Sequence, residues 1–131
     1  MSTAILGART SSLRRTTVLV GAVGAAATTL AAATMRAAGV HLAVRGSIPL
    51  AAFAQFTFVG AVLGGLIVAV LNRRSSLPRR RFIQIVVALA ALSCLAPAVG
   101  GDDVASKTGL TAIHLLAATI IAPVLARHAT R

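Results

Sequence analysis

Four long apolar stretches without a single charged residue divide the chain. They cover residues 17–35, 50–72, 82–99 and 110–126. A helix needs about 17 to 25 apolar residues to cross the hydrocarbon core of a bilayer, and each stretch reaches that length. The pattern predicts an all-α integral membrane bundle of four transmembrane helices, formed as a single membrane domain by residues 1–131.

The four stretches differ in how strongly they favour insertion. Leu, Ile, Phe and Val each contribute about 0.3–0.6 kcal/mol at the centre of a span. The second stretch holds twelve such residues, the third nine, the fourth eight and the first only five. The first span is therefore marginal. Its start also resembles a secretory signal peptide, because Arg14–Arg15 precede it and small residues surround Ala31–Ala33. We expect an uncleaved first span. Cleavage near residue 33 is the alternative, and it would leave three spans with the same cytoplasmic C-terminus.

Basic residues alternate along the chain in step with the spans. Ten of the thirteen Lys and Arg residues precede the first stretch, link the second to the third, or follow the fourth. The other two links hold Arg36, Arg45 and Lys107, and they hold both acidic residues, Asp102 and Asp103. Short loops rich in Lys and Arg stay in the cytoplasm. The alternation predicts a multi-pass plasma-membrane protein with both termini cytoplasmic.

The link between the second and third spans, NRRSSLPRRRF, is the most basic segment of the chain. Its arginines are Arg73, Arg74, Arg79, Arg80 and Arg81. Ser75, Ser76 and Pro78 are expected to break the helix, which makes residues 73–81 a cytoplasmic hinge. Each basic residue near an anionic inner leaflet contributes about 1 kcal/mol, so the arginines are predicted lipid-surface anchors. Specific lipid binding by the same arginines is the alternative.

The amino-acid composition argues against nucleic acid as the partner of these basic residues. The formal net charge of +11 and the pI near 12 would fit nucleic-acid binding. However, 57% of the residues are hydrophobic, the mean hydropathy is +0.90, and Trp and Tyr are missing. Proteins that bind single strands or RNA stack bases on aromatic side chains. We therefore expect no nucleic acid, and we expect a lipid bilayer with an anionic inner leaflet as the partner.

Small residues within the first two spans are candidates for helix packing, because they let lipid-embedded helices approach closely. The candidates, spaced by four, are Gly21, Ala25, Thr29 and Ala33 in the first span and Gly60 and Gly64 in the second. We expect them to make contacts within the bundle. A homodimer face, or a face for a partner membrane protein, is the alternative.

Few residues could carry chemistry. His114 is the one ionisable side chain inside a span, and Gln55, Ser93 and Cys94 are expected at a similar depth. With His41 of the outer loop they could form an outward-facing polar pocket, which would suit a small transporter or ligand-binding membrane protein. The alternative is that His114 and Gln55 simply bond across helices. No spacing indicates a catalytic triad, a metal site or a cofactor. We expect no enzyme, no metal and no cofactor, and favour a non-enzymatic envelope or membrane-assembly component.

Four segments together resemble a family of small uncharacterised actinobacterial four-span membrane proteins, some of which carry a cell-envelope label. They are AAGVHLAVRG, NRRSSLPRRRF, LSCLAPAV and AIHLLAATIIAPVLAR, and the resemblance covers roughly residues 15 to 128. It implies a four-span fold and a place in the cell envelope. Its most specific element is the histidine early in the fourth span, matched by His114. The family's outer loop often carries an acidic residue where this chain has His41.

Overall fold

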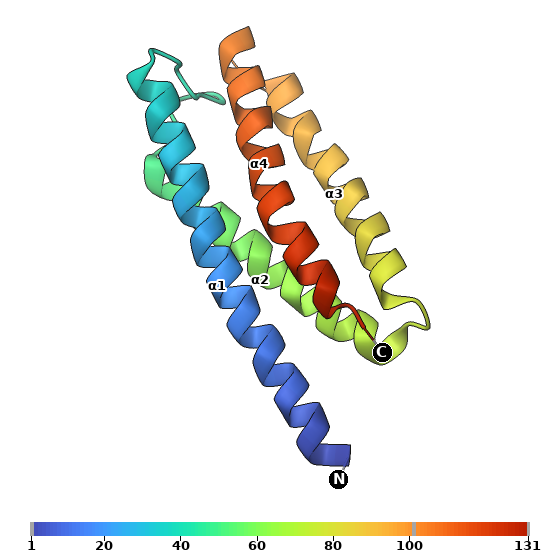
Figure 1. The fold of residues 1–131 in the computed structure, drawn as a ribbon. Coiled ribbons are helices and arrows are strands. Elements are labelled where there is room, and N and C mark those ends of the chain that lie inside the picture. Colours follow the sequence, from blue (N-terminus) through green and yellow to red (C-terminus); the bar gives the residue numbers. More distant parts are fainter. Residues whose placement is uncertain (1, 101, 131) are drawn as a thin grey trace.

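The protein folds into four helices joined by short links (Figure 1). The computed structural model describes residues 2–100 and 102–130, with side chains described from residue 11 onward. The helices are α1 (Ser2–Ala37), α2 (Leu50–Arg74), α3 (Pro78–Gly100) and α4 (Val104–His128). No strand occurs in this part of the chain, where an isolated bridge joins Ala43 and Ser47. All four helices are long and apolar enough to cross a membrane, which confirms the predicted fold class.

Each helix extends beyond the apolar stretch that predicted it. The reason is that apolar composition marks the part of a helix that fits the bilayer, whereas local capping decides where the helix ends. Pro78 occupies the first position of α3, where its missing N–H costs nothing. Asp103 caps α4. The link from α2 to α3 is only residues 75–77, so the five hinge arginines lie in helical turns rather than in a loop.

The helices do not form a symmetric four-helix bundle. α1 packs against α2 and α4, while α3 packs mainly on α4. Figure 1 shows that α3 approaches α2 only near their short link and then diverges from it. The N-terminal part of α1, the α2–α3 link and the segment after α4 share one end, which we call the hinge end. The loop of residues 38–49 and the α3–α4 link form the opposite loop end.

Buried side chains form two clusters, one toward each end. The hinge-end cluster contains Leu13, Val20, Val68, Phe82, Leu125, Ala126 and Ala129. The loop-end cluster contains Ala32, Leu42, Phe53 and Ile113. α1, α2 and α4 contribute to both clusters, whereas the one buried residue that α3 contributes is Phe82, in the hinge-end cluster.

The buried stripe of α1 departs from the predicted one. The fully buried positions along it are Leu13, Thr17, Val20, Gly21, Gly24, Thr28 and Ala32. Gly21 belongs to this stripe, but Ala25 is only half-buried. A spacing of strictly four residues drifts by about 40° per step around a helix of 3.6 residues per turn. The buried positions instead combine steps of three and four, which keeps one face inward.

Glycines on α2 face in different directions. A Cβ added at Gly64 would lie 2.8 Å from Leu125 Cδ1, and one added at Gly65 would collide with the side chain of Thr17. At Gly60 the same atom would meet nothing within 4 Å. Gly64 therefore packs within the bundle, whereas Gly60 faces away from it, and the alternative of a face for a second copy or a partner stays a prediction for Gly60. Gly65, which was not among the predicted packing residues, makes the tightest approach.

Candidate functional site

The loop end is built on a defined helix stop. Gly39 has φ of +86°, and its N–H donates to the carbonyl of Arg36 over 2.9 Å. The N–H of Val40 donates to the carbonyl of Met35, also over 2.9 Å. These two bonds form a Schellman motif, which ends α1 and needs a residue that tolerates positive φ. The chain therefore leaves α1 in a fixed direction.

The rest of this loop folds back on itself and docks on α4. The N–H of Ile48 donates to the carbonyl of Leu42 over 3.3 Å, which closes the loop around Arg45 and Gly46. Leu42 is only 2% exposed. A Cβ added at Gly109 would lie 2.9 Å from Leu42 Cδ2, so the glycine makes room for the leucine at the start of α4.

Asp102 and Ser106 bond this loop to the start of α4, and Asp103 caps that helix. The backbone N–H of Arg45 donates to Asp102 Oδ1 over 3.0 Å, and the N–H of Asp102 donates to the carbonyl of Ala43 over 3.4 Å. Asp103 Oδ1 accepts from the N–H of Ser106 over 2.6 Å, and Ser106 Oγ donates to the carbonyl of His41. The two acidic side chains of the chain are thus engaged in structure.

The same contacts shift the pKa of Asp103. Its pKa lies below the ordinary value of 3.8, first because of the Ser106 side chain and then because of the Ser106 N–H. The nearby His41 lowers the pKa further, and desolvation opposes these effects by raising it. A carboxylate that caps a helix is stabilised in its charged form, which is the sense of this shift.

The structure does not bring the predicted polar pocket together. A loop-end cavity of about 450 Å³ is lined by Arg36, Gly39, Val40, His41, Leu42, Ala43, Gly46, Ser47 and Asp102. Of the predicted pocket residues it contains only His41. His114 and Gln55 are exposed on the outer surfaces of α4 and α2, and Ser93 and Cys94 are half-buried on α3. Within the described residues, no three His, Cys, Asp or Glu side chains gather as a metal site would require.

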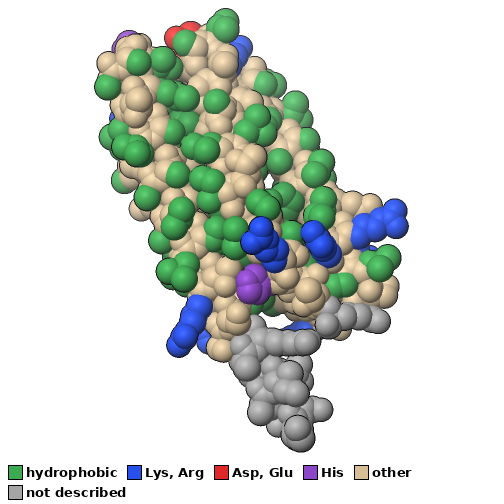
Figure 2. Space-filling model, viewed as in Figure 1, with side chains coloured by type: hydrophobic (Ala, Val, Ile, Leu, Met, Phe, Trp, Pro, Cys, Tyr) green, Lys and Arg blue, Asp and Glu red, His purple; other side chains and the backbone are tan. Residues whose placement is uncertain are grey.

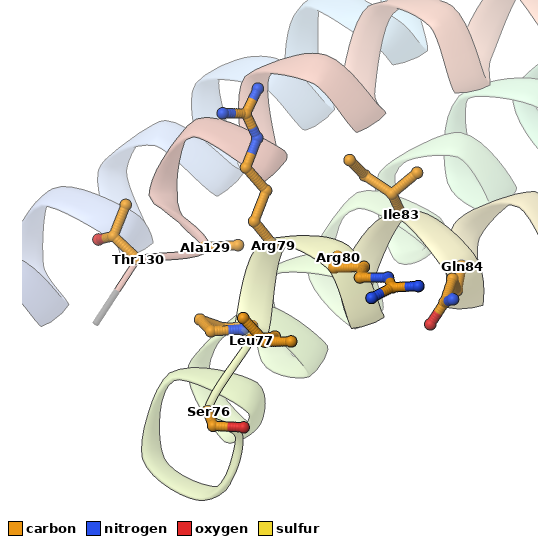
Figure 3. A pocket seen from close by; sticks show the side chains of 9 residues that line it. Ser76, Leu77, Arg79, Arg80, Ile83, Gln84, Ala129 and Thr130 are labelled. Carbon is orange, nitrogen blue, oxygen red and sulfur yellow. The ribbon is translucent and has the colours of Figure 1, made fainter.

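The hinge end holds a second cavity, of about 660 Å³, shown in Figure 3. It is lined by Ser76, Leu77, Pro78, Arg79, Arg80, Ile83, Gln84, Ala129 and Thr130. The first turns of α3 form one wall, and the segment after α4 forms the other. Arg79 extends toward α4, while Arg80 turns toward Gln84 (Figure 3). Two of the predicted lipid anchors therefore line a cavity, whereas Arg73, Arg74 and Arg81 are exposed outside it.

Specific contacts hold the walls of this cavity in place. Asn72 Nδ2 donates to the carbonyl of His128 over 2.8 Å, which ties the end of α2 to the end of α4. The N–H of Leu77 donates to Ser75 Oγ over 3.2 Å, which shapes the short link. Phe82, only 1% exposed, anchors α3 in the hinge-end cluster.

Sequence reasoning missed Gln84, Ala129 and Thr130 as parts of the hinge end. Gln84 follows Arg80 by four residues, so helical spacing alone places both on one face and could have indicated the pair. Nothing in the sequence pattern links Ala129 and Thr130 to the arginines, because that proximity depends on how α4 packs.

The comparisons with known proteins place the chain in a family but give it no activity. No curated protein and no solved structure matches it. A match over residues 8–131 covers nearly the whole chain and includes the loop end, the hinge arginines and His114. The protein belongs to a family of unknown function, DUF6069.

Proposed function

We propose that the protein is a non-enzymatic, multi-pass component of the plasma membrane, where it supports envelope or membrane assembly through contacts with lipid and neighbouring proteins. The observation that carries this proposal is the outward-facing apolar surface. Large exposed apolar side chains occur on all four helices and include Leu19, Leu30, Phe56, Leu66, Val87, Leu92, Leu95 and Leu115. A soluble monomer rarely exposes such a surface, whereas a bilayer covers it.

The distribution of charge supports an orientation with the hinge end in the cytoplasm. Figure 2 shows apolar side chains along the length of the bundle, most of the basic side chains toward the hinge end, and acidic ones together with a few basic ones at the opposite end. The described arginines toward the hinge end are Arg14, Arg15, Arg73, Arg74, Arg79, Arg80, Arg81 and Arg127. Such an excess of positive charge favours the cytoplasmic side.

The packing of α1 supports a first span that stays in the mature protein. Its residues enter both buried clusters, and Thr28 Oγ1 lies 3.0 Å from Thr57 Oγ1 of α2 in a hydrogen bond between helices. Ala32, at the centre of the possible cleavage site, has no exposed surface. Removal of α1 would uncover α2 and α4 along most of their length.

The roles of the polar groups support function by contact rather than by catalysis. Asp102 and Asp103 hold the loop-end structure, and His114 stands apart from Gln55, Ser93 and Cys94 on an outer surface. For the same reason, the hypothesis of a transporter pocket around His114 gains no support from the geometry. Replacing His114 and Gln55 with Leu should leave function intact in any assay that detects deletion of the gene.

Two measurements test the proposal. The protein recovered from washed membranes should have the intact mass of the full chain, and a mass lacking about the first 33 residues would exclude the uncleaved first span. For orientation, Ser76→Cys and Ser47→Cys are each made in a Cys94→Ser background. A membrane-impermeant maleimide added to intact cells should label the cysteine at 47 and not the one at 76. The reverse pattern, or a protein in the soluble fraction, would overturn the proposal.

A further inference from the structure

The hinge-end cavity has the chemistry of an anionic amphiphile site. Two guanidinium groups, from Arg79 and Arg80, come from consecutive residues of the first turn of α3 and point in different directions around the cavity (Figure 3). Guanidinium groups bind phosphate oxygens in pairs of charge-assisted hydrogen bonds. The carboxamide of Gln84 and the hydroxyls of Ser76 and Thr130 add neutral polar groups, which suit the hydroxyl and ester oxygens of a headgroup.

The remaining walls are apolar, and this separates the cavity from a site for a simple ion. Leu77, Ile83 and Ala129 contribute hydrocarbon to the lining. Beyond the cavity, Ile83 and Val87 are both well exposed on α3. Residues four apart lie on one face of a helix, so these two side chains form an apolar track that runs from the cavity along α3. A phosphate in the cavity could thus be continuous with an acyl chain on the track.

The charge of the cavity is not balanced by acidic side chains nearby. Asp102 and Asp103 are the only acidic side chains in the sequence, and both lie at the loop end. The N-terminal turn of α3 adds its own partial positive charge at the same place. An anion bound here would offset the mutual repulsion of Arg79 and Arg80.

We propose that this cavity binds the phosphate headgroup of one anionic phospholipid of the inner leaflet. The proposal rests on the proposed function, because it needs the hinge end to lie at the cytoplasmic surface. It differs from the general attraction of basic residues to an anionic surface, since it assigns the binding to Arg79 and Arg80 and not equally to the other hinge arginines.

A pair of charge-matched variants tests this distinction. Arg79→Gln with Arg80→Gln removes both cavity arginines, and Arg73→Gln with Arg74→Gln removes the same charge from the same end but outside the cavity. The full-length protein, purified in detergent, is titrated with phosphatidylglycerol or phosphatidylcholine, and bound lipid is counted by native mass spectrometry. We expect the wild type to prefer phosphatidylglycerol. The 79/80 variant should lose at least about tenfold in affinity for it, and the 73/74 variant less than about threefold.

Several results would overturn the lipid site. Equal losses in both double variants would assign the binding to surface charge, and no loss in either would exclude the arginines. Equal affinity for the two lipids would exclude recognition of the anionic headgroup. Inorganic phosphate or glycerophosphoglycerol is added as a competitor at the same concentration as the lipid. Displacement of the lipid by either would assign the cavity to a soluble phosphate compound.

The lipid titration and the maleimide assay together show which proposal has failed. The maleimide assay at residue 76 reports the side of the membrane without using lipid binding. If that cysteine is shielded from outside reagent but the 79/80 variant still binds lipid normally, the lipid site is wrong and the orientation stands. If the cysteine is labelled from outside, the orientation itself is wrong.

Discussion

α1 and α3 differ most among the four helices in how apolar they are and in how much of their surface is buried by the rest of the protein. The candidate span of α1 has a mean hydropathy of 1.8, and 33% of its most apolar window is buried within the protein. The span of α3 has a mean hydropathy of 2.3, and only 6% of the corresponding window is buried. The least apolar span is therefore the best packed, and the most apolar is the least packed. α1 packs against both α2 and α4, while α3 packs mainly on α4.

The difference follows from what each helix contacts. Lipid chains are as apolar as leucine side chains, so burial between helices gains little from large apolar residues. Close packing instead uses small residues and hydroxyls, and Gly21, Gly24 and Thr28 occupy the inner face of α1. Large residues such as Val87 and Leu92 are exposed on α3, where the bilayer provides their surroundings. The first span is only weakly apolar because its small and hydroxyl-bearing residues serve close packing against other helices.

The largest expected effect comes from crowding the contact of α1 with α2. In Gly65→Ala the new methyl group would collide with Thr17, a β-branched side chain that cannot swing away. We expect the free energy of unfolding to fall by about 2–3 kcal/mol, measured by SDS titration in mixed micelles with helical circular dichroism. Gly60→Ala, which meets open space, is the control and should be neutral or slightly stabilising. Adding Thr17→Ala to Gly65→Ala should restore most of the loss, and no rescue would mean that these residues do not touch.

Leucine truncation compares a buried and an uncovered position directly. Leu125 has no exposed surface and lies against Gly64, whereas Leu92 of α3 is 62% exposed. We expect Leu125→Ala to cost about 1–3 kcal/mol, less than in a soluble core because only the cavity term remains. Leu92→Ala should change the free energy of unfolding by less than about 0.5 kcal/mol. A large loss at Leu92 would show that α3 is covered by another protein chain.

A smaller effect is expected from the hydroxyl pair between α1 and α2. Thr28→Val keeps the shape of the side chain but removes its hydrogen bond to Thr57. Hydrogen bonds between lipid-embedded helices contribute about 0.6 kcal/mol on average and about 1.7 kcal/mol at most. Thr34→Val is the matched control, because Thr34 bonds only to the carbonyl of Leu30 in its own helix. The same SDS titration should show a loss for the first variant that exceeds that of the second.

The smallest expected effect is the pH dependence of the loop end. Since the folded state lowers the pKa of Asp103, the capping carboxylate contributes stability above its unfolded pKa of about 3.8. That contribution is lost as the pH falls through the lower pKa of the folded state. Protection from hydrogen exchange at the first turn of α4, taken relative to the intrinsic rate at each pH, should therefore fall in wild type below about pH 4. In Asp103→Ala, which removes the capping oxygen, the protection should already be lower at neutral pH and change less with pH, and identical profiles would contradict the capping role.

The sequence allowed the four helices to be predicted, but not which face of each helix is buried in the bundle. Uncharged apolar stretches of this length revealed the four helices, because a helix satisfies its backbone hydrogen bonds within one segment and needs such a length to cross the hydrocarbon core. The inward face was harder to predict, since lipid surrounds the bundle and apolar residues occur on every side. Ile113 is buried and the adjacent His114 is exposed, although both lie at the same depth. The depth of a residue along its helix could be predicted from the sequence, whereas the side of the helix that faces the bundle could not.

The candidate site was predictable to the same partial extent. The arginine cluster at the hinge end followed from local sequence alone. Its division into cavity residues and outer residues depended on the segment after α4, which reaches the hinge through the bond from Asn72 to the backbone of His128. That contact joins residues far apart in the chain, and no local spacing indicates it.

The three-residue link between α2 and α3 has a consequence for synthesis. Because residues 75–77 leave so little slack, the end of α2 and the start of α3 must lie at the same depth in a membrane. We therefore expect the two helices to insert as a hairpin with the five arginines at its tip. Lengthening this link should make the insertion of α3 independent of that of α2.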